Sequence, residues 1–288
     1  MTAPAGPTGG HGQEVLTQEV LALVNNLEGV FQQSVLQGAE AVLVAQGVTV
    51  TALALGELPD ETAVQRVVEG VATRARGVLV ISNALSDDAL RVAMSRGAVA
   101  TLVSHHVPGP AAPPTLMFDN RQGLQQLVSH LVADCGRNRP VFIGGDATQL
   151  DAQERQRAFL AETVRHDLRV PDENLLTGDF TPERAGAELQ RFMAAGGRFD
   201  SVVAADYLMA IAAQQTLRAA GVCVPAEVAV VGFGDGPEAE AAGVTTVAAD
   251  VVELGRRAAR QLLAQLDGGR LTGRTLLSTH LIRRPSSC

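Results

Sequence analysis

The run DSVVAADYLMAIAAQQTLRAAGVCVPAEVAVVGF (200–233) holds two short apolar stretches with a helix-length segment between them. The stretches 200–205 and 227–233 are rich in valine and too short for helices, which is typical of strands buried on both faces. Residues 206–220 have the length of a helix that returns the chain across a sheet. A strand, a helix and a second strand in this order predict a β-α-β unit, the repeating element of a parallel sheet.

The same alternation extends in both directions from this run. The predicted strands are residues 19–24, 48–55, 77–82, 98–103, 115–118, 140–145, 173–180, 200–205, 227–233, 244–249 and 275–284. The predicted helices are residues 29–47, 60–75, 86–96, 121–136, 151–167, 181–195, 206–220 and 250–267. The predicted N-caps are Asp60, Ser86, Asp119, Asp151 and Thr181. This number of strands is larger than one open sheet usually holds. The sequence therefore predicts an α/β fold of two doubly wound parallel-sheet lobes, with a boundary near 135–140.

The bulk composition excludes several classes of protein. Of the 288 residues, 46% are apolar, which is enough for large cores without disulfide staples. The net charge is −8 and the chain has no lysine. This excludes a Walker phosphate loop and a Schiff-base lysine, and argues against binding DNA by bulk electrostatics. The three cysteines are far apart and odd in number, so we expect no disulfide framework and a reducing cytoplasm.

The start of the chain and its apolar runs give no sign of export or membrane insertion. Residues 1–17 are rich in glycine, proline and threonine, which predicts a flexible tail. They lack the basic region and apolar run of a secretory signal. No apolar stretch approaches 18 residues. We therefore expect a cytoplasmic protein without a membrane partner.

Polar side chains follow one predicted strand after another. In open parallel sheets, ligands bind beyond the carboxyl ends of the strands. The candidate residues at these ends are Asn26, Asn83, Asp119, Asp206, Tyr207 and Asp235. Short polar side chains suit a small neutral polar ligand, such as a sugar or a nucleoside. The same residue types also form turns and helix caps. The prediction of a ligand site therefore depends on their recurrence after many strands rather than on any single position.

Motifs for catalysis or metal binding are not convincing. His105 and His106 are adjacent, so in extended chain they point in opposite directions, and no cysteine or second histidine motif supports them. There is no GxSxG motif, and GFGDG (232–236) lacks the GxGxxG spacing of a nucleotide loop. Arg155 in QERQRAF is either a surface charge or a ligand clamp, and the residues alone favour the surface. We therefore expect that the protein is not an enzyme and that it binds neither a cofactor nor a metal.

Two long segments resemble the effector-binding core of LacI/GalR-type transcriptional regulators. The segment FDNRQGLQQLVSHLVADCGRNRPVFIGGDATQLDAQERQRAFLAE (118–162) is similar to the family's DNxxG, helix, GHRRIAFIGG and RxxGF pattern. Residues 199–258, which include AADYLMA, VPAEVAVVGFGD and VTTV, are similar to its AANDLMA, VPxDVSVVGFDD and LTTV. The resemblance covers about residues 18–287 and is most specific in the second half.

The resemblance implies a periplasmic-binding-protein-like fold (type I) with a ligand cleft between two lobes. The implied crossovers lie near residues 135–140, 249–251 and 270–276. The implied lobes are residues 18–136 with 250–274, and residues 137–249 with 275–288. Closure of the cleft would change how a homodimer surface is presented. The helices 29–47 and 60–75 are the expected dimer face.

The family's ligand contacts carry over position by position. Phe31 matches an aromatic residue that packs on the ligand ring, and Asn83 matches a polar tip after the third strand. Asp119 matches the Asp of the DN pair. Arg155 matches an arginine that holds ligand hydroxyls or a carboxylate, which reverses the surface interpretation. Asp206 and Tyr207 stand where the family commonly has Asn and Asp.

Several positions depart from the family pattern. Gly234 stands where the family has a ligand-binding Asp, which leaves Asp235 as the next carboxylate. Ala249 stands in place of a frequent Gln, and Ser104-His105 in place of Asp-Arg. These departures put a pyranose clamped by Asp and Arg in doubt. They predict a different ligand or a degenerate pocket.

The resemblance implies the small-molecule-sensing domain of a LacI-type regulator. The family carries a helix-turn-helix before this core, and here the core begins near residue 18. DNA contact is therefore expected only through a module that these residues do not contain. One alternative is the sensing module of a signalling protein such as a diguanylate cyclase, which NNLEGVFQQSVLQG (25–38) resembles. Another is a ribose-type solute-binding protein, against which the missing signal peptide counts. The sequence specifies neither the ligand nor the sign of regulation.

Overall fold

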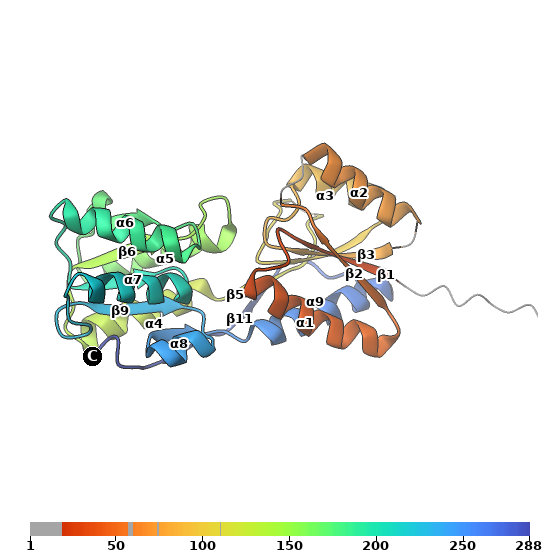
Figure 1. The fold of residues 1–288 in the computed structure, drawn as a ribbon. Helices are drawn as coiled ribbons and strands as arrows, with labels where there is room; N and C mark the ends of the chain where they lie inside the picture. The colour runs from red at the N-terminus through yellow and green to blue at the C-terminus, as the bar shows by residue number, and fades with distance from the viewer. Residues whose placement is uncertain (1–18, 57–59, 74, 110) are drawn as a thin grey trace, which may run out of the picture.

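The computed structural model describes residues 19–56, 60–73, 75–109 and 111–288, so the expected tail over 1–17 lies outside the described residues. Two α/β lobes lie end to end, and each has one sheet with helices on both faces (Figure 1). Because helices cover both faces, most inner strands are buried along their whole length. The predicted pair of doubly wound sheets is confirmed.

Each sheet has six strands within the described part of the chain. The strands of the first sheet are β1 (Glu19–Val24), β2 (Thr49–Ala54), β3 (Ala75–Ile81), β4 (Val99–Val103), β5 (Thr115–Phe118) and β11 (Arg274–Leu277). Those of the second are β6 (Pro140–Gly144), β7 (Leu175–Thr177), β8 (Ser201–Ala204), β9 (Ala229–Phe233), β10 (Thr245–Ala248) and β12 (His280–Ile282). Their spatial orders are β11-β5-β4-β3-β1-β2 and β12-β10-β9-β8-β6-β7. All pairings are parallel except β10 with β12.

Helices flank both sheets in pairs. The first lobe has α1 (Val30–Leu43), α2 (Asp60–Thr73), α3 (Asp87–Ser95) and α9 (Val251–Leu266). The second has α4 (Asn120–Ser129), α5 (Leu150–Arg165), α6 (Pro182–Ala194), α7 (Tyr207–Ala219) and α8 (Pro237–Ala242). Helix α1 packs along α9, α2 packs against α3, α4 against α5, and α6 against α7. None of the helices in the described ranges is long and apolar enough to cross a membrane.

The first crossover between the lobes lies earlier than the sequence predicts. Helix α4 packs against α5, β9, β10 and β12 of the second lobe, so the chain leaves the first lobe after Phe118. The expected boundary near 135–140, with residues up to 136 in the first lobe, is therefore wrong. A helix that follows a strand has the same amphipathic pattern whichever sheet it covers, so the pattern could not assign α4. After β10 the chain enters α9, which packs on α1 and β4 of the first lobe.

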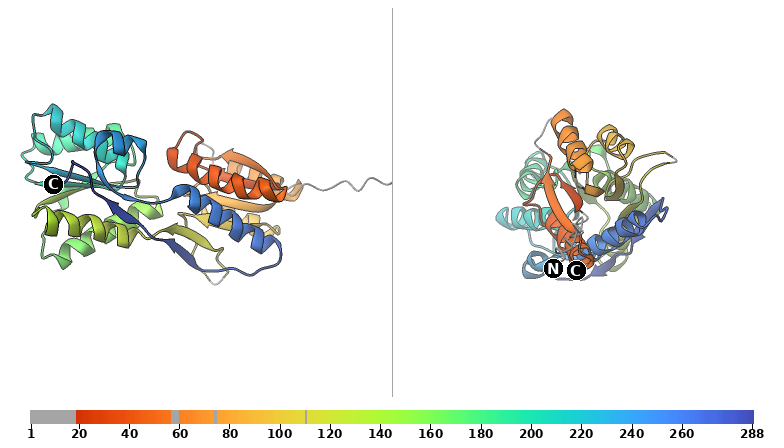
Figure 2. Two further views of the ribbon diagram at one scale, coloured as in Figure 1. Left: turned by 90° about the horizontal axis from the view of Figure 1, so that it is seen from below. Right: turned by 90° about the vertical axis from the view of Figure 1, so that its right-hand side faces the viewer.

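The last predicted strand, 275–284, is two strands in two sheets. Strand β11 pairs with β5, and β12 pairs with β10. The third crossover is therefore at 278–279 rather than 270–276, and residues 275–277 belong to the first sheet. Figure 2, left, shows this dark blue segment passing from one lobe to the other. Strand β7 is also shorter than the predicted 173–180, because residues 172–174 form a 3₁₀ turn.

The predicted helix caps hold at two of the described positions. Ser86 Oγ accepts from the N–H of Ala89 and caps α3, and Asp119 accepts from the N–H of Gln122 and caps α4. Asp151 is wrong as a cap, because it lies in the first turn of α5 after Gln149. Thr181 precedes α6, but its side chain makes no capping bond within the described contacts. The side chain of Asp60 lies outside the described part.

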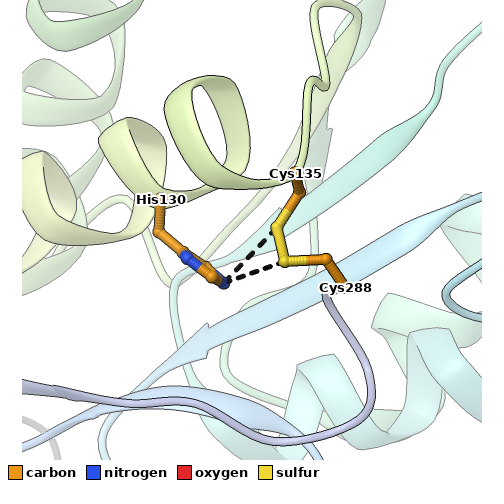
Figure 3. Close-up of side chains that lie close together, drawn as sticks. All are labelled: His130, Cys135 and Cys288. Carbon is orange, nitrogen blue, oxygen red and sulfur yellow. Dashed lines mark hydrogen bonds between the residues drawn. A yellow bond between two sulfur atoms is a disulfide. The ribbon is translucent and has the colours of Figure 1, made fainter.

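Two of the three cysteines are paired, contrary to the expectation of no disulfide. Cys135 follows the π-helical turn His130–Asp134 and forms a disulfide with Cys288, with their Cα atoms 5.4 Å apart (Figure 3). The two lie 153 residues apart in sequence, so no local spacing signals the pair. The C-terminal segment returns along the second sheet, where Ser286 bonds to the backbone of Val230 and Gly243. Cys223 is exposed and free.

Candidate ligand-binding cleft

A cavity of about 370 Å³ lies between the lobes at the carboxyl ends of the strands. This is where open parallel sheets bind ligands. The predicted site residues that line it are Asn26, Phe31, Arg155, Asp206, Tyr207 and Asp235. Asn26 and Phe31 come from the loop after β1 and the start of α1, and the other four come from the second lobe. The structure thus brings six of the eight predicted residues to one cavity with walls from both lobes.

Aromatic side chains form apolar walls on both sides of this cavity. Phe31 lies on the first-lobe side, and Phe180 and Tyr207 lie on the second-lobe side. Phe180 follows β7 with a φ of 57°, in the left-handed region that side chains rarely adopt. Its ring packs over Gly145, where an added Cβ would lie 2.2 Å from Phe180. Gly145 is therefore required by the close approach of this aromatic wall.

Arg155 is held in the cavity wall by a network of contacts. Only 8% of the residue is exposed, so the surface interpretation drawn from the residues alone is wrong. Its Nε donates to Asn120 Oδ1 at 2.9 Å, and its Nη1 donates to the carbonyl of Ala205 at 2.7 Å. Its Nη2 lies 3.6 Å from Asp151 Oδ2. The guanidinium also stacks over the Phe233 ring, 3.9 Å from its centroid.

Arg155 and Asp206 place opposite charges in the same wall. Asp206 caps α7, and its Oδ1 accepts from the N–H groups of Leu208 at 2.7 Å and Met209 at 3.2 Å. Burial raises the pKa of Asp206, opposed by these N–H donors and by Arg155. Burial lowers the pKa of Arg155, opposed by Asp151 and Asp206. Each charged side chain therefore stabilises the charged form of the other, because neither is well solvated.

Tyr207 presents a neutral hydroxyl to the cavity. Its hydroxyl donates to Glu238 Oε2 at 3.3 Å. Burial, followed by the nearby carboxylates of Glu238 and Asp206, raises the pKa of Tyr207, so the phenol stays protonated. Gly234 lies against this ring with a φ of 81°, a conformation that favours glycine. The glycine that replaces the family's Asp therefore fits both the local backbone and the position of Tyr207.

Asp235 is already bound by side chains of its own lobe. Arg284 donates to both of its oxygens, at 2.7 and 2.9 Å, and Thr246 Oγ1 donates to Oδ1 at 2.7 Å. Burial alone would raise the pKa of Asp235, but the hydrogen bonds from Arg284 and Thr246 outweigh it and lower the pKa. The carboxylate lines the cavity while the segment after β12 holds it in place.

Asp235→Asn is expected to lower stability at neutral pH by about 1–2 kcal/mol, because a charge-assisted bidentate pair is lost. The folded-state pKa of Asp235 is depressed, so its contribution is present above the unfolded pKa of about 3.9 and is lost as pH falls through the folded value. Urea unfolding at pH 7 and near pH 3 measures this. The difference between variant and wild type should shrink at the acid pH. Asp172→Asn, at an exposed carboxylate, is the control; a pH-independent loss in Asp235→Asn would contradict the assignment.

Asn83 and Asp119 are not among the described residues that line the cavity. Asn83 Oδ1 accepts from Asn25 Nδ2 at 2.7 Å, and Asn83 Nδ2 donates to Thr148 Oγ1 at 3.0 Å. Asn83 thus connects the two lobes beside the cleft. Asp119 accepts from the N–H of Gln122 at 2.9 Å and caps α4. A capping and a bridging role account for these two residues without a ligand.

Sequence reasoning missed part of the cavity wall. Asp151 and Phe180 line it, as does Phe233 beneath Arg155. Asp151 stands four residues before Arg155, and this helical spacing was a usable signal for an ion pair. The left-handed backbone at Phe180 has no such signal, because phenylalanine seldom adopts it.

A second depression, of about 680 Å³, lies between α2 and α3, away from the cleft. Asp87 and Asp88 line it and occupy the first turn of α3, where the helix dipole stabilises them. Asp88 pairs with Arg91 at 2.7 Å, and His105 lies 3.3 Å from Asp87. These charges have local partners, and the depression is wide open. The cleft between the lobes is the better candidate site.

The fold and its cleft define a class of protein. Two α/β lobes joined by three crossovers around a cavity are the architecture of periplasmic-binding-protein-like domains. Residues 128–287, more than half of the chain, match the family described as periplasmic binding protein-like domain. The chain belongs to this family, and its core is of the type found in LacI-family regulators.

Named relatives of the chain are transcriptional regulators. The chain is 32% identical over 172 residues to the HTH-type transcriptional regulator CelR of Thermobifida fusca, covering 59% of this chain and 50% of CelR. It is 30% identical over 218 residues to the HTH-type transcriptional repressor MelR of Bacillus subtilis (strain 168), covering 73% and 62%. The chain thus spans about half to six tenths of these relatives. They do not favour a cyclase-linked sensor or a solute-binding protein.

Solved structures share the whole architecture. A lac repressor dimer bound to operator and the anti-inducer ONPF aligns with a TM-score of 0.86 at 18% identity, covering 95% of each chain. A complex of the transcriptional regulator CelR with cellobiose aligns with a TM-score of 0.80 at 25% identity, covering 94% of this chain and 86% of that one. The lac repressor structure supports the fold alone.

Proposed function

We propose that this chain is the small-molecule-sensing core of a LacI-type transcriptional regulator, and that it acts by binding rather than by catalysis. The observation that carries this is the cavity between the lobes, which the buried Arg155 and the half-buried Asp206 line from one lobe and Phe31 lines from the other. In this proposal Asn26, Phe31, Arg155, Asp206, Tyr207 and Asp235 contact the ligand.

The chemistry of the cavity favours a sugar. The rings of Phe31 and Phe180 offer apolar faces to the C–H face of a pyranose or glucoside. The Tyr207 hydroxyl, Asp206 and Gln149 offer hydrogen-bonding groups for its hydroxyls. Gly234 and Ala249 leave two positions without polar side chains, so recognition there is by shape. Cellobiose is the first ligand to test, because a CelR complex with it has this fold.

The lobes would act as two bodies that close on the ligand. We take the first lobe as residues 19–118 with 250–277, and the second as 119–249 with 278–288. Closure biases how first-lobe helices α1 and α2 present a dimer surface. DNA is contacted by a module other than these lobes, in line with the net charge of −8. The proposed setting is the cytoplasm, where such a regulator reaches its operator.

Thermal unfolding against a panel of cellobiose, other glucosides, monosaccharides, nucleosides and purines tests this proposal. A ligand at 100 times its dissociation constant adds about 2.7 kcal/mol, which raises Tm by about 5 °C. We expect such a shift with a sugar. Phe31→Ala should weaken binding on the order of tenfold, because an aromatic contact is lost.

Leu27→Ala is the matched control for Phe31→Ala. Leu27 is exposed and lies four residues earlier, but it is not among the described lining residues. It should leave the shift unchanged. Phe31→Ala should roughly halve the sugar-induced shift at the same ligand concentration, and a shift as large as in the wild type would reject the site assignment. A shift only with purines or nucleosides would keep a sensing core and reject the sugar, and no shift with any compound would reject the sensing function.

A further inference from the structure

A second cluster of reactive side chains lies far from the cleft, at the C-terminal end of the second lobe. His130, Cys135 and Cys288 meet where the π turn after α4 touches the C-terminal segment (Figure 3). The imidazole nitrogen and the two sulfurs all lie within 4.8 Å of one another. His130 is 3% exposed, whereas Cys288 is exposed. The cluster therefore has a rigid buried donor and a donor that solvent can reach.

The distances match a tetrahedral zinc site except for the sulfur–sulfur bond. His130 Nε2 lies 3.5 Å from Cys135 Sγ and 3.9 Å from Cys288 Sγ. With zinc bonds of about 2.0–2.1 Å to nitrogen and about 2.3 Å to sulfur, the nitrogen–sulfur edge of a tetrahedron is about 3.6 Å. The sulfur–sulfur edge is about 3.8 Å, so a metal needs cleavage of the disulfide, a small rotation of Cys288 and displacement of the Ser287 hydroxyl that lies 2.9 Å from Nε2.

The histidine is already held in the tautomer that binds metals. Its Nδ1 lies 2.9 Å from Asp134 Oδ2, and a carboxylate only accepts, so Nδ1 carries the proton. The other ring nitrogen, Nε2, faces the sulfurs and lies 2.9 Å from the Ser287 hydroxyl, a contact that a metal would replace. Arg283 also binds Asp134 and fixes it. A carboxylate behind a histidine is the usual outer partner of a zinc ligand.

We propose that His130, Cys135 and Cys288 form a zinc site when the disulfide is reduced. A dithiol reductant gives two electrons and two protons to the S–S bond, leaves two thiols and itself becomes a disulfide. Zinc then forms two Zn–S bonds and one bond to Nε2, and both thiol protons pass to water. Water fills the fourth position, which the exposed side of Cys288 leaves open. In a reducing compartment the zinc replaces the disulfide in holding the C-terminal segment to α4.

Cobalt(II), as an optical substitute for zinc, tests the site on the whole chain. Cys223→Ser removes the free exposed thiol and serves as the background protein. Reduced with a dithiol and then freed of it, this protein should bind one equivalent of Co²⁺ with a thiolate charge-transfer band that Zn²⁺ abolishes. The same protein left oxidised should show no band. This comparison changes no residue of the cluster, so a failure to fold does not confuse it.

Single changes in the cluster complete the test. Cys135→Ser and Cys288→Ser, each in the Cys223→Ser background, should lose at least about a hundredfold in Co²⁺ affinity. Asp134→Asn should lose about 10–100-fold, because it acts through the histidine. No charge-transfer band in the reduced Cys223→Ser protein would overturn the proposal. An equal band in the oxidised protein, or in either cysteine variant, would overturn it as well.

Discussion

Arg155→Met is expected to lower the free energy of unfolding by about 3–5 kcal/mol, as breaking a buried ion pair does. Methionine keeps the volume and the apolar contact with Phe233 but removes the charge. Asp151 loses its cationic partner at 3.6 Å, and Asp206 loses the cation that opposes its desolvation. The hydrogen bond to the Ala205 carbonyl is also lost. Urea unfolding at pH 7 measures the change.

Arg157→Met is the matched control, since Arg157 lies on the same helix but is exposed. It should change stability by no more than about 0.5 kcal/mol. The double variant Arg155→Met/Asp151→Asn should recover part of the loss, because it removes one of the stranded carboxylates. Equal effects of the two arginine variants would mean that Arg155 is not a structural centre of the cleft.

The fold was largely predictable because its signal is repeated along the chain. Each strand is a short apolar run and each helix has an amphipathic face, so the doubly wound class follows from alternation. The assignment of α4 to a lobe was not predictable, since a helix covers either sheet with the same face. The split of 275–284 was not predictable either, because TLLSTHLIRR has no glycine or proline to mark a break, although its two halves pair with different sheets.

The candidate site was predictable to the extent that strand tips decide it. Asp206 and Tyr207 follow within three residues of the end of β8, and Asp235 within two of the end of β9, so topology alone brings them to one edge. The packing partners of Arg155 could not be predicted, because they are distant in sequence and meet it only in the folded structure. Asp151 is the exception, because it stands four residues before Arg155 on the same helix. The Cys135–Cys288 pair is the extreme case, because a C-terminal segment had to be placed against α4 before the two sulfurs could meet.

Gly255→Ala is expected to lower the free energy of unfolding by about 3 kcal/mol, the upper range for overpacking. Helices α1 and α9 approach backbone to backbone at two glycines. A Cβ on Gly255 would lie 2.1 Å from the Val35 carbonyl oxygen, and one on Gly38 would lie 2.0 Å from that of Val252. Neither contact relaxes by rotating a side chain, so the helices must separate. Thermal or urea unfolding measures the loss, and Gly38→Ala should match it.

Gly186→Ala on α6 separates crowding from the intrinsic effect of the substitution. Its Cβ would meet only the rotatable Thr216 hydroxyl, at 3.0 Å, so we expect a change within about 1 kcal/mol, since alanine also favours the helix. The crowded pair has a consequence in the cleft as well. Phe31 on α1 and Val251 on α9 both line the cavity, so helices forced apart displace part of its wall. Gly255→Ala should therefore weaken ligand binding as well as lower the free energy of unfolding. A Gly255→Ala protein as stable as the wild type would contradict this, because it would mean that α1 and α9 slide past each other and that the cleft tolerates their movement.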